Sequence, residues 1–143
     1  MKNVHEQFSL ALCDVARGWR TTVNERLKPL GLTQAKWLTF MHLSKCKKGI
    51  IQKELAQLMG IEGPTLVRLL DRLEADGWVE RRSLASDRRS KLVFLSDKAA
   101  PVVIKIRKIV NDLRTEVLSA VPDKELTISL AVLRRIHDRI ESL

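Results

Sequence analysis

The amino-acid sequence predicts a mainly α-helical protein with one small β-hairpin. Along most of the chain, apolar residues recur at steps of three and four, the spacing of a helix with one buried face. After Gly77 the period changes to two over residues 78–82 and 91–95, as in a pair of strands. Glycine and proline stand where these patterns break, so the elements can be placed in order.

The N-terminal third predicts two helices. The first spans residues 6–27, and its apolar stripe consists of Phe8, Leu12, Val15, Trp19, Val23 and Leu27. The segment 28–32, which holds a proline and a glycine, ends this pattern. Thr33 then suits the N-cap of a second helix that should end near Lys47.

A third, short helix is expected after the turn at Lys48-Gly49. It runs from about Ile51 to Met59, with Leu55 and Leu58 facing inward, and Gly60 closes it.

The fourth helix has the clearest boundaries. Gly63-Pro64 places proline in the first turn, where its missing N–H costs nothing. Gly77 suits a left-handed C-terminal cap. The apolar face between them consists of Leu66, Leu69, Leu70 and Leu73.

A hairpin and two longer helices complete the chain. The polar loop 83–90 joins the two strands and is longer than a tight turn. Ser96-Asp97 caps a helix over about 97–119, in which Pro101 falls in the tolerant first turn. Its stripe is Val103, Ile106, Ile109, Val110, Leu113 and Val117. The last helix begins at Pro122-Asp123, and its stripe is Leu126, Leu130, Leu133, Ile136 (or His137) and Ile140.

The charge indicates a polyanionic partner. Lys plus Arg is 26 and Asp plus Glu is 17, so the 143 residues carry a net charge of +9. Residues 33–96 hold 12 basic and 7 acidic groups, a net +5, and the hairpin 78–91 alone holds 5 against 2. Such a patch is typical of nucleic-acid binding.

Several classes of protein are excluded. No run of about 18 apolar residues could span a membrane. Glu6 and Asp14 interrupt any signal-peptide core, which favours a cytoplasmic location. The two cysteines, Cys13 and Cys46, form no CxxC pair, so neither a metal nor another cofactor is expected. No nucleophile–base pair or phosphate loop is visible, which argues against an enzyme.

The short helix, glycine turn, longer helix and basic hairpin together predict a winged helix-turn-helix. The fourth helix would lie in the major groove, where Arg68 is the first candidate for reading guanine and Thr65 and Arg72 lie nearby. Arg68 and Arg72 could instead pair with neighbouring carboxylates. In the hairpin loop, the wing, Asp87 could hold an arginine by a two-bond fork and direct it into a minor groove.

The apolar stripes of the end helices exceed what one small lobe can cover. We therefore expect residues 1–32 and 97–143 to form a helical dimerisation region, and residues 33–96 to form the DNA-binding lobe. The alternative is that the stripes close within one monomer. A two-fold dimer would place two recognition helices about one DNA turn apart, ~34–36 Å, and would select a palindrome.

Three segments carry a family resemblance: Leu27-Lys28-Pro29-Leu30-x-Leu32-Thr33-Gln34, Gly60-Ile61-Glu62-x-Pro64-x-Leu66-Val67-Arg68 and Ala85-Ser86-Asp87-Arg88-Arg89. With the order of elements, they resemble the MarR family of bacterial transcription regulators, and within it the SlyA branch. The resemblance implies a homodimer on palindromic, AT-rich promoter DNA that represses, activates or does both. Arg89 would enter the minor groove, Asp87 would hold it, and Arg88 would contact the backbone or share the role of Arg89. The candidate DNA-binding residues are Gly63, Pro64, Thr65, Arg68, Arg72, Arg82, Asp87, Arg88 and Arg89.

The resemblance also implies a site for small aromatic carboxylates such as salicylate. By position, Arg17 would pair the carboxylate, Trp37 would stack on the ring and Thr33 would lie beside them. Trp37 could equally be a core residue, and Arg17 could bridge helices. Some family members sense peroxide through a cysteine in the first helix, supported by tyrosines. Cys13 lies in that helix, but the chain has no tyrosine.

Overall fold

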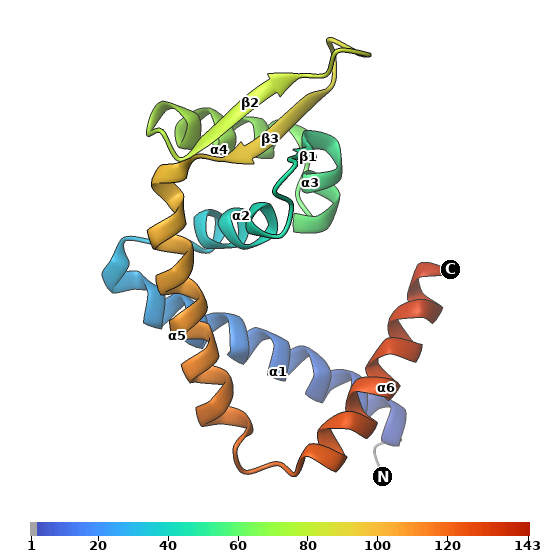
Figure 1. Cartoon of the computed structure of the whole chain (residues 1–143). Coiled ribbons are helices and arrows are strands. Elements are labelled where there is room, and N and C mark those ends of the chain that lie inside the picture. The colour runs from blue at the N-terminus through green and yellow to red at the C-terminus, as the bar shows by residue number, and fades with distance from the viewer. Residues whose placement is uncertain (1–2) are drawn as a thin grey trace. The chain divides into compact units, whose positions relative to one another are not determined.

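The computed structural model describes residues 3–143 and confirms a mainly α-helical fold with a small antiparallel sheet (Figure 1). The predicted order of helices, hairpin and helices is observed. The helices are α1 (Val4–Leu27), α2 (Gln34–Ser44), α3 (Gln52–Met59), α4 (Gly63–Ala75), α5 (Ala100–Leu118) and α6 (Asp123–Glu141), with short 3-10 helices at Lys28–Leu30 and Asp97–Ala99.

The sheet has three strands in the order β1-β3-β2. β2 (Val79–Ser83) and β3 (Lys91–Leu95) form the expected hairpin, with Val79 opposite Leu95 and Ser83 opposite Lys91. The short strand β1 (Ile50–Ile51) pairs with the other edge of β3 and was not predicted. Two residues are too few to show a period of two, so the sequence carried no signal for it.

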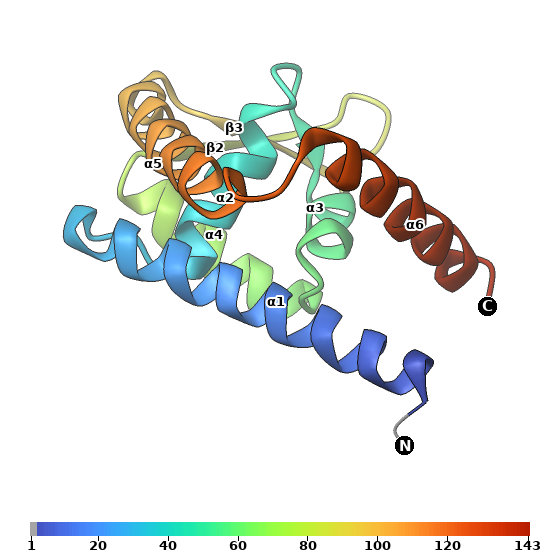
Figure 2. The ribbon, with the colours of Figure 1, turned by 90° about the horizontal axis from the view of Figure 1, so that it is seen from below.

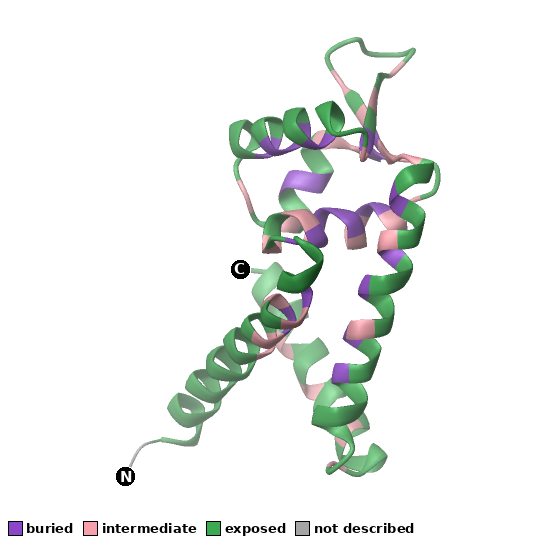
Figure 3. Cartoon of the chain, turned by 90° about the vertical axis from the view of Figure 1, so that its left-hand side faces the viewer, coloured by how far each residue is buried: buried purple, intermediate pink, exposed green. Residues whose placement is uncertain are grey.

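Buried residues lie on α2, α3, α4 and the sheet, and further ones lie at the end of α1 and along one side of α5 (Figure 3). On α4, all four leucines of the predicted face are buried. In α3, Leu55 is buried but Leu58 is 59% exposed, so its inward placement was wrong. Ala56 is buried instead, because it lies on the other side of Leu55 around the helix axis. The largest fully buried side chains are Phe40, Leu27, Leu55, Leu66, Leu70, Ile106 and Leu113.

The chain divides into two compact units, and the boundary lies within α5 after Ile109. In the first unit, α1 runs along the side of α2 that faces away from the sheet (Figures 1 and 2). Its N-terminal half leaves Phe8, Leu12 and Val15 exposed. In the second unit, α6 has no buried residue, and Leu130, Leu133 and Ile140 are exposed. Each unit, taken by itself, therefore leaves an apolar helix face uncovered.

Candidate nucleic-acid interface

Helix α4 presents a polar face outward because its apolar face is buried in the core. Pro64 stands in its first turn, and the four leucines hold the opposite face in the core. Thr65, Arg68 and Arg72 are exposed on the outer side. Gly60 ends α3 in the left-handed conformation (φ 65°), which lets the chain turn sharply into α4. The helix pair predicted from the sequence is therefore formed.

The end of α4 is fastened to the hairpin that follows it. Gly77 has φ 79°, its N–H donates to the carbonyl of Glu74 (3.0 Å), and the N–H of Trp78 donates to the carbonyl of Leu73 (2.8 Å). Trp78 thus completes the helix end, and the strand begins one residue later than the predicted Trp78. The hydroxyl of Ser96, after β3, donates to the carbonyl of Gly77 (2.6 Å).

Arg81 of β2 joins the hairpin to the polar side of α4. Its Nη2 donates to Asp71 (2.5 Å) and Glu74 (3.0 Å), and its backbone N–H donates to Glu74 Oε2 (3.0 Å). The Arg81 side chain is only 18% exposed. The side-chain hydrogen bond between Arg81 and Glu74 is the main reason why the pKa of Glu74 is lowered and that of Arg81 raised.

This arrangement leaves the outer arginines of α4 without acidic partners. The alternative in which Arg68 and Arg72 pair with Asp71, Glu74 or Asp76 is not observed, and Arg81 holds the first two of these carboxylates. Within the described residues, the guanidinium groups of Arg68 and Arg72 form no ion pair. Arg81 itself was counted in the basic hairpin but was not recognised as structural.

We expect Arg81→Met to lower the free energy of unfolding by ~1–2 kcal/mol, because charge-assisted hydrogen bonds are removed while the exposure of Asp71 and Glu74 limits their value.

The pH dependence of stability provides a separate check on the bond between Arg81 and Glu74. Since the pKa of Glu74 is lowered on folding, its contribution is present above the ordinary carboxyl pKa and is lost as the pH falls through the lowered value. Urea unfolding of wild type and Glu74→Gln should therefore differ at neutral pH and differ less at acidic pH. An equal difference at both pH values would contradict this role.

The wing is ordered by Asp87, though not in the way expected. Asp87 Oδ1 accepts a hydrogen bond from the backbone N–H of Arg89 (2.9 Å), and Oδ2 accepts one from the hydroxyl of Ser90 (3.1 Å). The predicted two-bond contact between this carboxylate and a guanidinium is therefore not formed. An aspartate carboxylate readily accepts a hydrogen bond from the backbone N–H two residues later, and this bond closes a local turn. Asp87 positions the backbone of Arg89 and leaves its side chain outside.

The basic residues of the hairpin fall into two groups. Arg88 and Arg89 are exposed near the tip of the loop, which projects beyond α3 and α4 (Figure 1). Arg82 lies lower on β2, where its Nη2 pairs with Glu80 (3.0 Å) and its guanidinium lies 4.9 Å from the centre of the Phe94 ring. Arg82 is thus partly committed within the sheet, whereas the two loop arginines are not.

A hollow of about 510 Å³ lies between α3, the start of α4 and residues 89–91 at the C-terminal side of the wing. It brings together Gly63 and Arg89, two of the predicted DNA-binding residues, with Lys91 of the basic hairpin. It also includes Gln52 and Lys53, which sequence reasoning missed. The Oε1 atom of Gln52 is buried without a hydrogen-bond partner in the described structure. The only sequence signal for these two residues was their place in the first turn of α3.

The three residues proposed to bind a ligand have different roles in the structure. Trp37 is 7% exposed, and its Nε1 donates to Asn24 Oδ1 (2.7 Å), so its ring is a core element and does not present a stacking face. Thr33 is the N-cap of α2, as predicted, and accepts from the N–H of Lys36. Arg17 is 74% exposed and pairs with Asp14 on the same helix.

Other chemistry-bearing groups are scattered. Cys13 is exposed and Cys46 is half-buried, and both are free thiols. Burial and the nearby charge of Lys45 lower the pKa of His42, which favours a neutral imidazole. No group of three or more potential metal ligands lies together within residues 3–143. No helix in that range is long and apolar enough to cross a bilayer.

Comparison with known proteins agrees with this geometry. A model of the MarR family matches residues 30–90. The crystal structure of the transcriptional regulator PA3341 is 40% identical in sequence, with a TM-score of 0.87, and the match covers 95% of this chain and 99% of that one. A mutant MarR from E. coli complexed with operator DNA is 26% identical (TM-score 0.79; 91% and 93% covered). CouR from Rhodococcus jostii RHA1, bound to p-coumaroyl-CoA, is 24% identical (TM-score 0.80; 95% of each chain covered).

The match to PA3341 extends over nearly the whole of both chains and includes the sequence as well as the fold. The family model covers the helix pair and the wing. The members of this family are DNA-binding regulators of transcription and not enzymes. The chain therefore belongs to the MarR family of transcriptional regulators.

Proposed function

We propose that this regulator binds palindromic, AT-rich promoter DNA as a homodimer, with α4 in the major groove and the wing in the minor groove. The observation that carries the proposal is the set of unpaired arginines on two neighbouring projections. Arg68 and Arg72 lie on the outer side of α4, and Arg88 and Arg89 lie near the wing tip. Membership of a SlyA-like branch is proposed from the order of elements and the same three segments that carry the family resemblance, residues 27–34, 60–68 and 85–89.

Each projection suits one groove of the DNA. The major groove accepts one α-helix, and an arginine there can donate two hydrogen bonds to guanine O6 and N7. Thr65 and the N-terminal residues Gly63 and Pro64 bring the α4 backbone close to phosphate. A narrow AT-rich minor groove has a strong negative potential that attracts an arginine such as Arg89. Arg82 lies further from the tip, where it would reach the backbone only by leaving Glu80.

The dimer follows from the uncovered helix faces. The exposed apolar side chains of α1 and those of α6 need a partner surface, and a second copy supplies the same surfaces by symmetry. On this proposal residues 1–32 and 97–143 form the dimerisation region, and residues 33–96 form the DNA-binding lobe. Light scattering should give twice the chain mass of 16.3 kDa.

A small aromatic carboxylate such as salicylate is the proposed effector at Arg17 and Thr33. The exposed guanidinium of Arg17 supports this site. The ring of Trp37 is buried, so we propose that it supports the site from the core and does not stack on the ligand. A cytoplasmic location agrees with a DNA-binding role. Release of bound DNA by salicylate from wild type, but not from Arg17→Ala, is the expected result.

The main test is a binding selection from a random duplex library at physiological salt, using the purified full chain. We expect recovery of an AT-rich palindrome whose half-sites lie about one DNA turn apart. Recovery of unselected DNA with a steep salt dependence would replace the proposal by an architectural role. Recovery of no DNA would overturn DNA binding as the activity of this chain under these conditions.

A further inference from the structure

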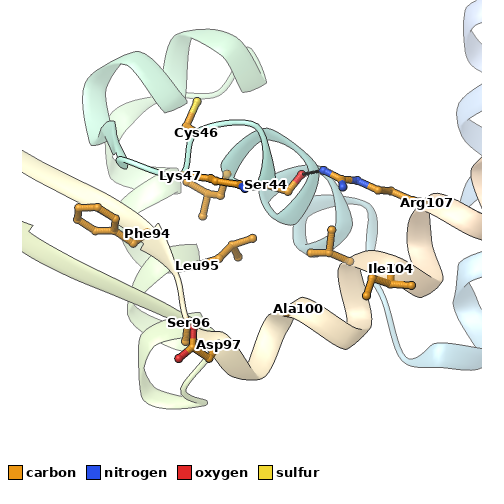
Figure 4. A pocket seen from close by; sticks show the side chains of 12 residues that line it. Ser44, Cys46, Lys47, Phe94, Leu95, Ser96, Asp97, Ala100, Ile104 and Arg107 are labelled. Atoms are coloured by element: carbon orange, nitrogen blue, oxygen red, sulfur yellow. Dashed lines mark hydrogen bonds between the residues drawn. The ribbon is translucent and has the colours of Figure 1, made fainter.

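The C-terminal end of α4 is held by the segment that joins β3 to α5, where Figure 4 shows Ser96 and Asp97 beside a hollow of about 390 Å³. The three consecutive carbonyls of residues 76–78, just after the helix, all accept hydrogen bonds from this segment. Lys98 Nζ donates to the first carbonyl (2.7 Å), Ser96 Oγ donates to the second (2.6 Å), and the backbone N–H of Ser96 donates to the third (3.0 Å). We call residues 96–98 the end clamp of α4.

Lys98 makes a second contact at the same place, with the indole ring of Trp78. Its Nζ lies 4.2 Å from the ring centre, and the Nζ of Lys36 on α2 lies 4.6 Å from the same point. A cation over an aromatic ring is attracted by the quadrupole of the ring. Lys98 adds to this contact its hydrogen bond to the Asp76 carbonyl, which places a positive charge at the negative end of the α4 dipole. Lys98 therefore ties the end of α4 to the segment that leads into α5.

The backbone of the end clamp is anchored independently of the Lys98 side chain. Ala99, the next residue, is fully buried, and its N–H donates to the carbonyl of Ser96 (3.1 Å). Lys98 is itself exposed, so replacing its side chain leaves the packing of the core intact. The contribution of its ammonium group to the position of α4 can therefore be measured separately from the fold.

The position of the α4 end matters for base contacts at the start of the helix. The 13 residues of α4 give it a length of about 20 Å. A tilt of about 3° therefore moves one end by about 1 Å relative to the other, which exceeds the roughly 0.5 Å range of good hydrogen-bond distances. An arginine discriminates guanine by aligning two bonds at once. Since Thr65 and Arg68 lie toward the start of α4, their alignment depends on how its other end is held.

We propose that Lys98 is a positioning residue for DNA recognition, which sets the tilt of α4 and thereby controls the discrimination between the selected DNA sequence and unrelated DNA. This inference rests on the proposed function, because it requires that α4 reads bases. Base contacts depend on alignment, whereas binding to unrelated DNA depends mainly on the charges that neutralise phosphates. Loss of the Lys98 bond therefore weakens binding to the selected sequence more than binding to unrelated DNA.

The test compares Lys98→Met with Lys36→Met in the full chain. Each substitution removes one positive charge and one cation over the Trp78 ring, but only Lys98→Met removes the bond to the Asp76 carbonyl. Competition fluorescence anisotropy gives the ratio of the affinities for the selected duplex and for a scrambled duplex of equal length and composition. We expect Lys98→Met to lower this ratio at least ~5-fold, because a hydrogen bond from a charged donor is lost. Lys36→Met should stay within about twofold, since loss of one charge affects both duplexes alike.

The ratio separates positioning from a merely structural role. A general loss of stability reduces the folded fraction, which lowers both affinities and leaves their ratio unchanged. The conservative variant Lys98→Arg keeps a charged donor and should recover most of the wild-type ratio. Equal ratios in the two methionine variants, or no recovery in Lys98→Arg, would overturn the positioning role.

A second measurement uses the protein without DNA. The backbone N–H groups of Gly77 and Trp78 close the end of α4, so their hydrogen exchange reports how firmly that end is held. Exchange at both positions should be faster in Lys98→Met than in Lys36→Met, and equal rates would contradict the clamp. A wild-type chain that selects no sequence would overturn the proposed function, a result that the exchange rates distinguish from failure of the clamp itself.

Discussion

Replacing Arg88 and Arg89 together by alanine is expected to lower the affinity for the selected DNA by roughly 10- to 100-fold at physiological salt. Both side chains are exposed near the wing tip and have no acidic partner within residues 3–143, so their charge is available to DNA. The dependence of log K on log salt should become shallower by about 0.9 for each phosphate that the variant no longer neutralises. Fluorescence anisotropy over a salt series measures both quantities.

The matched control for the wing removes two exposed lysines elsewhere, Lys105→Ala with Lys124→Ala. It lowers the net charge by the same amount but leaves the hairpin unchanged, so affinity and salt slope should fall far less. The fold of the wing variant should be intact, because Asp87 orders the loop through the backbone N–H of residue 89, which alanine retains. Unchanged DNA binding in the wing variant would show that the hairpin does not touch DNA.

The variant Arg68→Ala should relax sequence choice at one position of each half-site. A two-bond contact from arginine to guanine discriminates by ~1–3 kcal/mol, so the preferred base at that position should lose about 5- to 150-fold of its advantage. Arg68 is free to make this contact because Arg81 holds the neighbouring carboxylates Asp71 and Glu74. A repeat of the random-library selection with the variant measures the change directly.

A second substitution separates charge from geometry at this position. Arg68→Lys keeps the positive charge but cannot form the planar fork, so the salt slope should stay close to wild type while base discrimination falls. If Arg68→Ala retained the wild-type preference at every position, base readout would have to be assigned to other residues of α4, with Thr65 and Arg72 the next to substitute.

The helices and the hairpin could be predicted because their patterns repeat over several turns or residues. The four leucines of α4 and the glycine that ends it were placed correctly from spacing alone. The capping role of Thr33 was also confirmed. β1 could not be predicted, because its two residues gain their conformation from pairing with Leu92 and Val93 on a distant strand.

The interface was predictable in outline but not in its internal contacts. Composition located the basic hairpin, but it could not separate Arg81, which holds α4, from the exposed Arg88 and Arg89 of the loop. That distinction depends on which face of β2 meets α4, a matter of three-dimensional register. The hydrogen bond from Arg107 to Ser44 joins residues 63 positions apart, and no local pattern carries such a contact.

The fastening of α4 to the hairpin through Arg81 has a consequence for the order of folding. Its two partners, Asp71 and Glu74, lie only ten and seven residues away in sequence. Closing such short loops costs little chain entropy, and structures rich in local contacts form rapidly. We therefore expect the recognition helix and strand β2 to dock early in folding, before distant pairings such as that of β1 with β3 are made.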